Sequence, residues 1–157
     1  MIILGIDPGT SRLGWAILKS KKEEIIPINY GCFEFEGQNN EKLLKIFKKI
    51  EQLIKSYHPN IIAIEKIFFF KNAKTAMSIS EAKGVILLVA QKNKIKTIEL
   101  TPLEIKQYLI GYGRANKKDV QKMIQYFFCL DSLPKPDDTS DAIAVALAGL
   151  NKYLNHQ

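Results

Sequence analysis

The segment from residue 41 to residue 65 constrains the fold more than any other part of this chain. Residues 41–57 carry apolar side chains at spacings of three and four, with lysines on the other face, which predicts an amphipathic helix. His58 and Pro59 end that helix, and the apolar segment 60–65 predicts a buried strand. A helical crossover places the two strands that it joins parallel in one sheet. The strand 60–65 should therefore lie parallel to a strand that precedes the helix 41–57.

The N-terminal part of the chain supplies that strand and two more. Residues 1–7 form an apolar run that ends in an acid, and residues 13–18 and 25–35 predict two further strands around a polar hairpin. Short connections favour antiparallel pairing among these strands. Residues 95–100 predict one more short strand. The sequence therefore predicts an α/β fold in which a parallel centre carries an antiparallel flank.

The C-terminal half is predicted to be mainly helical. A helix over residues 73–91 contains Gly84, and the later segments begin with typical helix starts. Thr101 precedes Pro102 and Glu104, the pattern of a capped N-terminus, and a further helix opens at Asn116. An Ala-rich helix runs from about residue 138 to residue 154. No linker or repeat divides the 157 residues, so we expect a single domain over residues 1–157.

Composition narrows the class of partner and the compartment. Lysine and arginine number 23 against 16 acids, a net charge of +7 that suggests a polyanion such as nucleic acid, although a lysine-rich soluble surface gives the same balance. No apolar run approaches the roughly 20 residues of a membrane span, and no signal peptide is visible. Cys32 and Cys129 lack the spacing of a zinc site. We expect a cytoplasmic protein that does not contact a membrane.

Acidic residues follow two of the predicted strands and open the last helix. Asp7 and Glu65 each come directly after an apolar run, and the carboxyl ends of neighbouring parallel strands meet at one edge of a sheet. Asp138 and Asp141 are three residues apart and share one helix face. Each aspartate alone could serve a turn or a helix cap, and Asp137 could be the cap in place of Asp138. Glu65 lies within an apolar run, where an acid is costly without a partner.

Four acids at one point would repel one another, and a divalent cation removes that repulsion. Mg²⁺ prefers carboxylate oxygens and often binds substrate phosphates as well. Two such ions can stabilise both the attacking and the leaving oxygen of a phosphoryl displacement. The sequence contains no P-loop and no GxGxxG motif, and neither histidine is placed as a metal ligand or base. The pattern therefore favours metal-dependent phosphodiester chemistry.

The ordered set of motifs resembles the RuvC family of Holliday junction resolvases over essentially the whole chain. The motifs are Gly5-Ile6-Asp7-Pro8-Gly9, Ala63-Ile64-Glu65, Phe68 to Ala73, and Asp138-Thr139-Ser140-Asp141-Ala142. The resemblance implies a ribonuclease H-like fold, with a mixed five-stranded sheet in the order 3-2-1-4-5 and helices on both faces. It also implies a homodimer built on the helix 73–91. The implied reaction is cleavage of two opposed strands of four-way junction DNA, which leaves 5′-phosphate and 3′-hydroxyl ends.

The same resemblance assigns roles to individual residues. It implies that two Mg²⁺ ions, or Mn²⁺ in their place, are held by Asp7, Glu65, Asp138 and Asp141. It implies that an aromatic side chain at Phe68 stacks at the junction, where Phe69 and Phe70 are alternative candidates. The proteins RuvA and RuvB are implied partners. The family's DNA-contacting lysines match Lys106 and Lys117. Three other basic residues, Lys71, Arg114 and Lys118, are added as DNA-binding candidates.

Three other functions stay open at this point. A YqgF-like nuclease of the same superfamily, which acts on RNA, also opens with a strand, an acid and a Gly-Thr turn. An actin-like or sugar-kinase-like domain has a similar first phosphate loop but needs two such domains around its nucleotide. A DNA-binding module without activity would keep the lysines but would not need acids at the strand ends. Calorimetry with ATP would separate the kinase-like domain from the nucleases.

Overall fold

The fold is built on one mixed sheet of five strands. The computed structural model describes residues 1–22, 24–66 and 73–155. The strands lie in the order β3-β2-β1-β4-β5, which confirms the predicted order. β1 pairs antiparallel with β2 and parallel with β4, β2 pairs antiparallel with β3, and β4 pairs parallel with β5. Their bounds are β1 Ile2–Asp7, β2 Arg12–Lys21, β3 Glu24–Glu34, β4 Ile61–Glu65 and β5 Lys96–Leu100.

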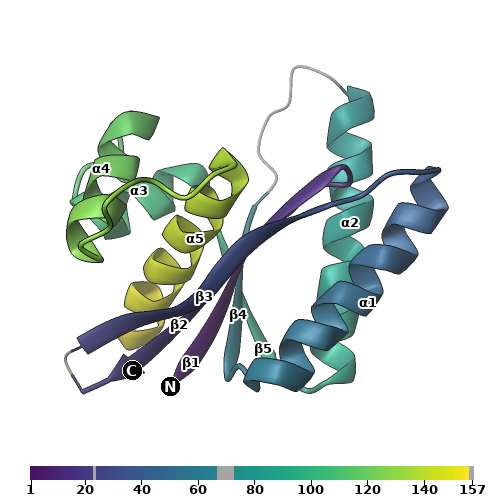
Figure 1. Ribbon diagram of the computed structural model, residues 1–157, viewed down its shortest axis with the longest axis horizontal. Coiled ribbons are helices and arrows are strands. Elements are labelled where there is room, and N and C mark those ends of the chain that lie inside the picture. The colour runs from purple at the N-terminus through teal and green to yellow at the C-terminus, as the bar shows by residue number, and fades with distance from the viewer. Residues whose placement is uncertain (23, 67–72, 156–157) are drawn as a thin grey trace.

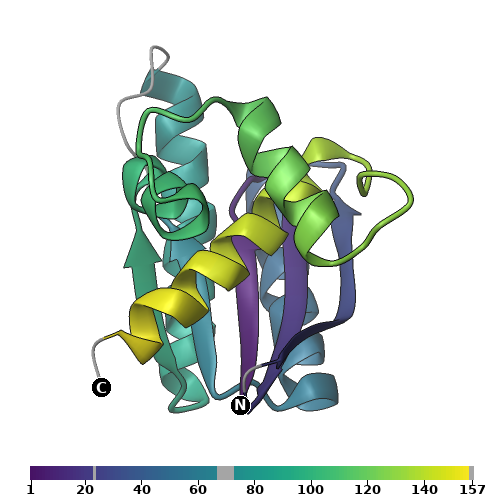
Figure 2. The ribbon, with the colours of Figure 1, turned by 90° about the vertical axis from the view of Figure 1, so that its left-hand side faces the viewer.

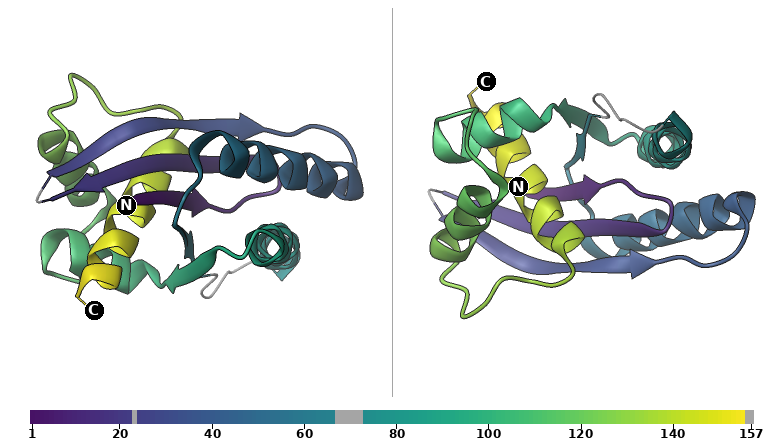
Figure 3. Two further views of the ribbon diagram at one scale, coloured as in Figure 1. Left: turned by 90° about the horizontal axis from the view of Figure 1, so that it is seen from below. Right: turned by 90° about the horizontal axis from the view of Figure 1, so that it is seen from above.

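Helices cover both faces of the sheet, as predicted. α1 and α2 lie on one side, and α3, α4 and α5 lie on the other (Figure 1). α5 crosses the strands obliquely (Figure 2), and the views from below and above show it and α1 on opposite sides of the strands (Figure 3). The helices are α1 Asn39–Tyr57, α2 Ala73–Lys92, α3 Pro102–Ile110, α4 Lys117–Phe127 and α5 Asp137–Leu154. Within the described ranges, no helix combines the length and apolarity needed to cross a bilayer.

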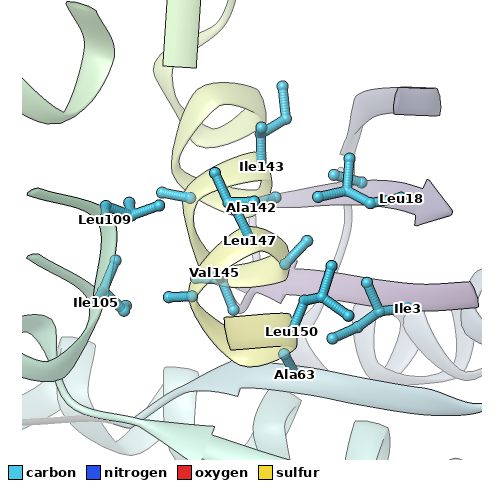
Figure 4. Packing of buried hydrophobic residues seen from close by; sticks show 14 of the residues in the cluster. Ile3, Leu18, Ala63, Ile105, Leu109, Ala142, Ile143, Val145, Leu147 and Leu150 are labelled. Carbon is cyan, nitrogen blue, oxygen red and sulfur yellow. The ribbon is translucent and has the colours of Figure 1, made fainter. Parts of the chain in front are cut away.

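The alternation of side chains along the strands produces two separate cores. Ile3 of β1 and Leu18 of β2 point toward α5, where they pack with Ala142 and Leu147 (Figure 4). Leu4 of β1 points the other way and belongs to the cluster shared with α1 and α2. Both faces of the central strands are thus buried, which explains why β1 and β4 read as continuous apolar runs in the sequence.

Glycines on the strands let α5 approach the sheet unusually closely. A Cβ atom at Gly14 of β2 would collide with the carbonyl oxygen of Asp138, and one at Gly5 of β1 would collide with Ala146. Further along α5, a Cβ atom at Gly149 would collide with Ala63 of β4. Small residues on both surfaces therefore set the position of α5, including that of its first turn.

The starts of α3 and α4 agree with the sequence, whereas α1 begins at Asn39, two residues before its predicted start. Thr101 caps α3 by accepting a hydrogen bond from the Glu104 amide at 3.2 Å, and Asn116 caps α4 in the same way. The last helix begins at Asp137, one residue before the predicted start, with Pro136 at the N-cap. Asp137 is therefore a helical residue on the same helix as Asp138, and neither acid is the cap.

Candidate active site

The predicted acids converge on one edge of the sheet. Asp7 and Glu65 are the last residues of β1 and β4, which are neighbours, and the preceding residues Ile6 and Ile64 pair in register. The start of α5 lies over the same edge, because Gly14 pairs with Asp7 and packs under the first turn of that helix. Figure 1 shows the ends of β1 and β4 and the beginning of α5 in its upper half.

Two cavities meet at Glu65. The larger, of about 550 Å³, is lined by Asp7, Glu65 and Asp138, together with the turn between β1 and β2 and side chains of α2. The smaller, of about 190 Å³, is lined by Glu65, Asp141, Lys117 and residues of α3. Each of the four predicted acids thus lines one of two cavities beside the carboxyl edge of the sheet, where ligands bind in α/β folds, and Glu65 lines both.

The electrostatics of the site disfavour ionised carboxylates. Burial, followed by the neighbouring charges of Glu65, Asp141 and Asp138, raises the pKa of Asp7 to about 8. Burial and the charge of Asp141 raise the pKa of Glu65 to about 7. The pKa of Asp141 is also raised, mainly by burial, although Lys117 opposes this shift. Protons held on these acids near neutral pH indicate that the site has too little positive charge to balance four carboxylates.

Two basic side chains supply part of the balancing positive charge. The Lys117 ammonium, at the first turn of α4, lies 2.9 Å from a carboxylate oxygen of Asp141 and 3.2 Å from one of Asp137. Burial lowers the pKa of Lys117, but its hydrogen bonds to these two acids outweigh that effect and raise it. Arg12, at the start of β2, lies 3.5 Å from Asp138. Lysine and arginine therefore pair with all three acids of α5.

The donor set fits a hard divalent ion, although its side chains are not yet gathered around one point. Among residues 1–22, 24–66 and 73–155, no three Asp, Glu, His or Cys side chains already form a ligand cluster. Asp138 and Asp141 are instead turned to Arg12 and Lys117. Carboxylate oxygens are the ligands that Mg²⁺ and Mn²⁺ prefer, and a divalent ion offsets the repulsion among neighbouring acids. These four acids could hold such ions once the two basic side chains withdraw.

The predicted DNA contacts fall into three groups. Lys106 lines the smaller cavity with Lys117, so α3 and α4 each place a lysine beside the acids. Lys118, the next residue of α4, and Arg114, just before that helix, are exposed. Phe68 and Lys71, with the alternatives Phe69 and Phe70, lie outside the described residues.

Sequence reasoning misses two charged side chains beside the predicted acids, Arg12 and Asp137. The sequence alone indicates Asp137 only as an alternative cap to Asp138, and it indicates no role for Arg12. The adjacent acids at 137 and 138 were a signal for Asp137, since residues four apart on a helix, such as Asp137 and Asp141, share one face. No local pattern pairs Arg12 with Asp138, because these residues are 126 positions apart.

The sheet order, with the acids at its carboxyl edge and the α5 crossing, defines a ribonuclease H-like protein. The family model described as crossover junction endodeoxyribonuclease RuvC matches residues 3–149. The chain therefore belongs to the RuvC family, whose members are metal-dependent nucleases.

Individual relatives agree with this family along nearly the whole chain. The crossover junction endodeoxyribonuclease RuvC of Caldicellulosiruptor saccharolyticus is 43% identical over 150 residues, which cover 94% of this chain and 90% of that protein. The protein of the same name from Desulfitobacterium hafniense is 41% identical over 149 residues, with the same two shares. The structure described as Thermus thermophilus RuvC in complex with Holliday junction substrate has a TM-score of 0.94 at 24% identity, over 99% of this chain and 96% of that one.

Proposed function

We propose that this chain is a structure-selective endonuclease that resolves four-way DNA junctions by paired nicks in opposed strands, in recombination and DNA repair. Membership in the RuvC family supports the activity, and the relatives that share about 40% of its residues bear the name of that enzyme. The observation that carries the proposal is the convergence of Asp7, Glu65, Asp138 and Asp141 on one sheet edge. The family match, rather than the acids, favours this proposal over the RNA-cleaving and kinase-like alternatives.

The four acids are proposed to hold two Mg²⁺ ions, or Mn²⁺ in their place. Bound ions supply an activated water and stabilise the leaving oxygen of the phosphodiester, which leaves 5′-phosphate and 3′-hydroxyl ends. Asp7 is coupled to the whole set, since the charges of Glu65, Asp141 and Asp138 each raise its pKa. Asp7 and Glu65 must give up their protons, and Asp138 and Asp141 must give up Arg12 and Lys117, when the ions arrive.

The basic residues around the cavities are proposed to bind the junction. Lys106 and Lys117 lie beside the acids, where a strand must pass, and Arg114 and Lys118 extend this basic surface. Phe68 and Lys71 are further proposed contacts. Phosphate contacts fix the position of DNA on a protein without reading its sequence, which suits an enzyme that recognises a branched shape.

The partner surface is proposed to lie on α2. Met77 and Leu88 of this helix are 67% and 61% exposed, and Gly84 between them is also exposed. These residues share one helix face at spacings of seven and four, and a glycine permits close approach of a second helix. A homodimer through this face gives each of two symmetric scissile strands its own site. RuvA, RuvB and a cytoplasmic location remain proposals from the family resemblance.

A cleavage assay with three substrates tests the function. A four-way junction, a linear duplex of the same sequence and a structured RNA are incubated with the protein in Mg²⁺. We expect nicks in the junction only, and we expect Glu65→Gln to abolish them while junction binding persists, since binding depends on lysines. Glu24→Gln, which changes an exposed acid at the opposite end of β2 from the site, where Glu24 pairs with Lys21, should cleave normally. Equal cleavage of RNA, or normal cleavage by Glu65→Gln, would contradict the proposal.

A further inference from the structure

Asp137 is the acid near the site that the proposed ion binding does not use. It is the first residue of α5, and its carboxylate lies 3.2 Å from the Lys117 ammonium. The same ammonium lies 2.9 Å from Asp141, one turn further along the helix. The side chain of Asp137 is 68% exposed, whereas that of Asp141 is 33% exposed. Lys117 therefore bridges an inner and an outer carboxylate.

The two acids that pair with Lys117 should respond differently when an ion binds. Asp141 lines the smaller cavity with Glu65, so an ion held by these acids takes its oxygens. The ion also repels the ammonium. Asp137 lies on the outer side, and a lysine ammonium carries three donors that can stay bonded to it while another donor is freed.

We propose that Asp137 is a positioning residue, which keeps the Lys117 ammonium at the edge of the site after an ion has displaced it from Asp141. The lysine then stays beside the cavity that it lines with Lys106, where it can meet a substrate phosphate. Without Asp137, the ion pair that Lys117 keeps among the described residues is the one with Asp141. An arriving ion must then compete with Lys117 for Asp141. This inference rests on the proposed function of the four acids.

A double-mutant cycle on ion binding tests the proposal without substrate. Mn²⁺ is titrated into the complete, DNA-free protein by calorimetry for wild type, D137N, K117M and K117M/D137N. An exposed ion pair contributes up to about 1 kcal/mol, so we expect D137N to weaken Mn²⁺ binding about three- to five-fold. With Met at position 117 no lysine competes, and D137N should then change the affinity by less than about 1.5-fold. An equal loss in both backgrounds would overturn the proposal, because Asp137 would then act as an ion ligand or a simple charge.

Cleavage at saturating Mg²⁺ gives a second, independent measurement. D137N should lower kcat about three-fold, D137E should restore it, and K117M/D137N should be no slower than K117M. D131N removes the same charge from an exposed residue of the loop before α5 and should leave both measurements unchanged. A loss of kcat in D137N that persists with Met at position 117 would refute the positioning role. If the proposed function itself is wrong, Glu65→Gln will cleave normally. That result does not depend on the double-mutant cycle, so the two failures can be told apart.

Discussion

At the scale of single residues, Asp7 shows how a site built for cations destabilises the protein that carries it. Its pKa of about 8 means that the folded chain favours the neutral acid, whereas the unfolded chain ionises it near the ordinary value of 3.8. Glu65 behaves alike, with a pKa of about 7. Ions that replaced the protons would remove this cost, so the residues proposed to hold the ions would also link folding to metal binding.

The sign of the resulting pH dependence is opposite to that of an ordinary salt-bridged acid. Between pH 4 and pH 8 the folded protein binds more protons at Asp7 and Glu65 than the unfolded chain does, so its free energy of unfolding falls as the pH rises. In EDTA, we expect wild type to be less stable at pH 8 than at pH 5. Asp7→Asn should flatten this dependence and gain about 1–3 kcal/mol at pH 8.

Urea unfolding at pH 5 and pH 8, with and without Mg²⁺, measures this effect. Mg²⁺ should restore the stability of wild type at pH 8 and do little for Asp7→Asn. Asp131→Asn provides the matched control, since it removes an exposed acid. Identical pH profiles for wild type and Asp7→Asn would show that Asp7 ionises freely in the folded protein.

At the scale of elements, the sequence predicts most of what positions the site. Apolar runs that end in Asp7 and Glu65 identify β1 and β4 because both strands are buried on both faces. The Thr101 cap is predictable because its bonds are local. The pairs of Arg12 with Asp138 and of Lys117 with Asp137 are not, because they depend on where α4 and α5 pack. Local chemistry thus predicts the acids, whereas tertiary packing decides their partners.

The close approach of α5 to β2 at Gly14 allows a test of whether the position of Asp138 matters for cleavage. An alanine Cβ there would collide with the carbonyl oxygen of Asp138, so the first turn of α5 must move away from the Asp7 edge. We expect Gly14→Ala to lower the free energy of unfolding by about 1–3 kcal/mol. It should also reduce junction cleavage at least ten-fold under conditions where the variant is fully folded.

Cys32 provides the control for that variant. It pairs with Gly14 on the neighbouring strand β3, so Cys32→Ala changes the same rung of the sheet without adding volume under α5. Cleavage by Cys32→Ala should remain near that of wild type, with stability followed by urea unfolding in parallel. Full cleavage by a folded Gly14→Ala protein would show that the position of the first turn of α5 is not critical.

At the scale of the whole molecule, the net charge of +7 and the acidic site have separate tasks. The four acids gather in the cavities at one sheet edge, while the lysines of α3 and α4 lie beside them and others cover the surface. A positive surface attracts DNA from a distance, and a local acidic cluster then retains ions that a cleavage reaction needs. The described residues of one chain form one such site, so the proposed paired cleavage of a junction would use two copies of the chain.

The exposed face of α2 allows that requirement to be tested directly. Leu88 is 61% exposed in the single chain, and a charge there would be buried without a partner if a second α2 packs on this face. Light scattering should find wild type at twice the chain mass of 17.8 kDa and Leu88→Glu at that mass. On a junction, Leu88→Glu should nick one strand and leave the opposed strand intact. Leu154→Glu, which charges a 48% exposed leucine at the end of α5, should stay dimeric and cut both strands. A Leu88→Glu protein that remains dimeric would place the symmetric interface on another face.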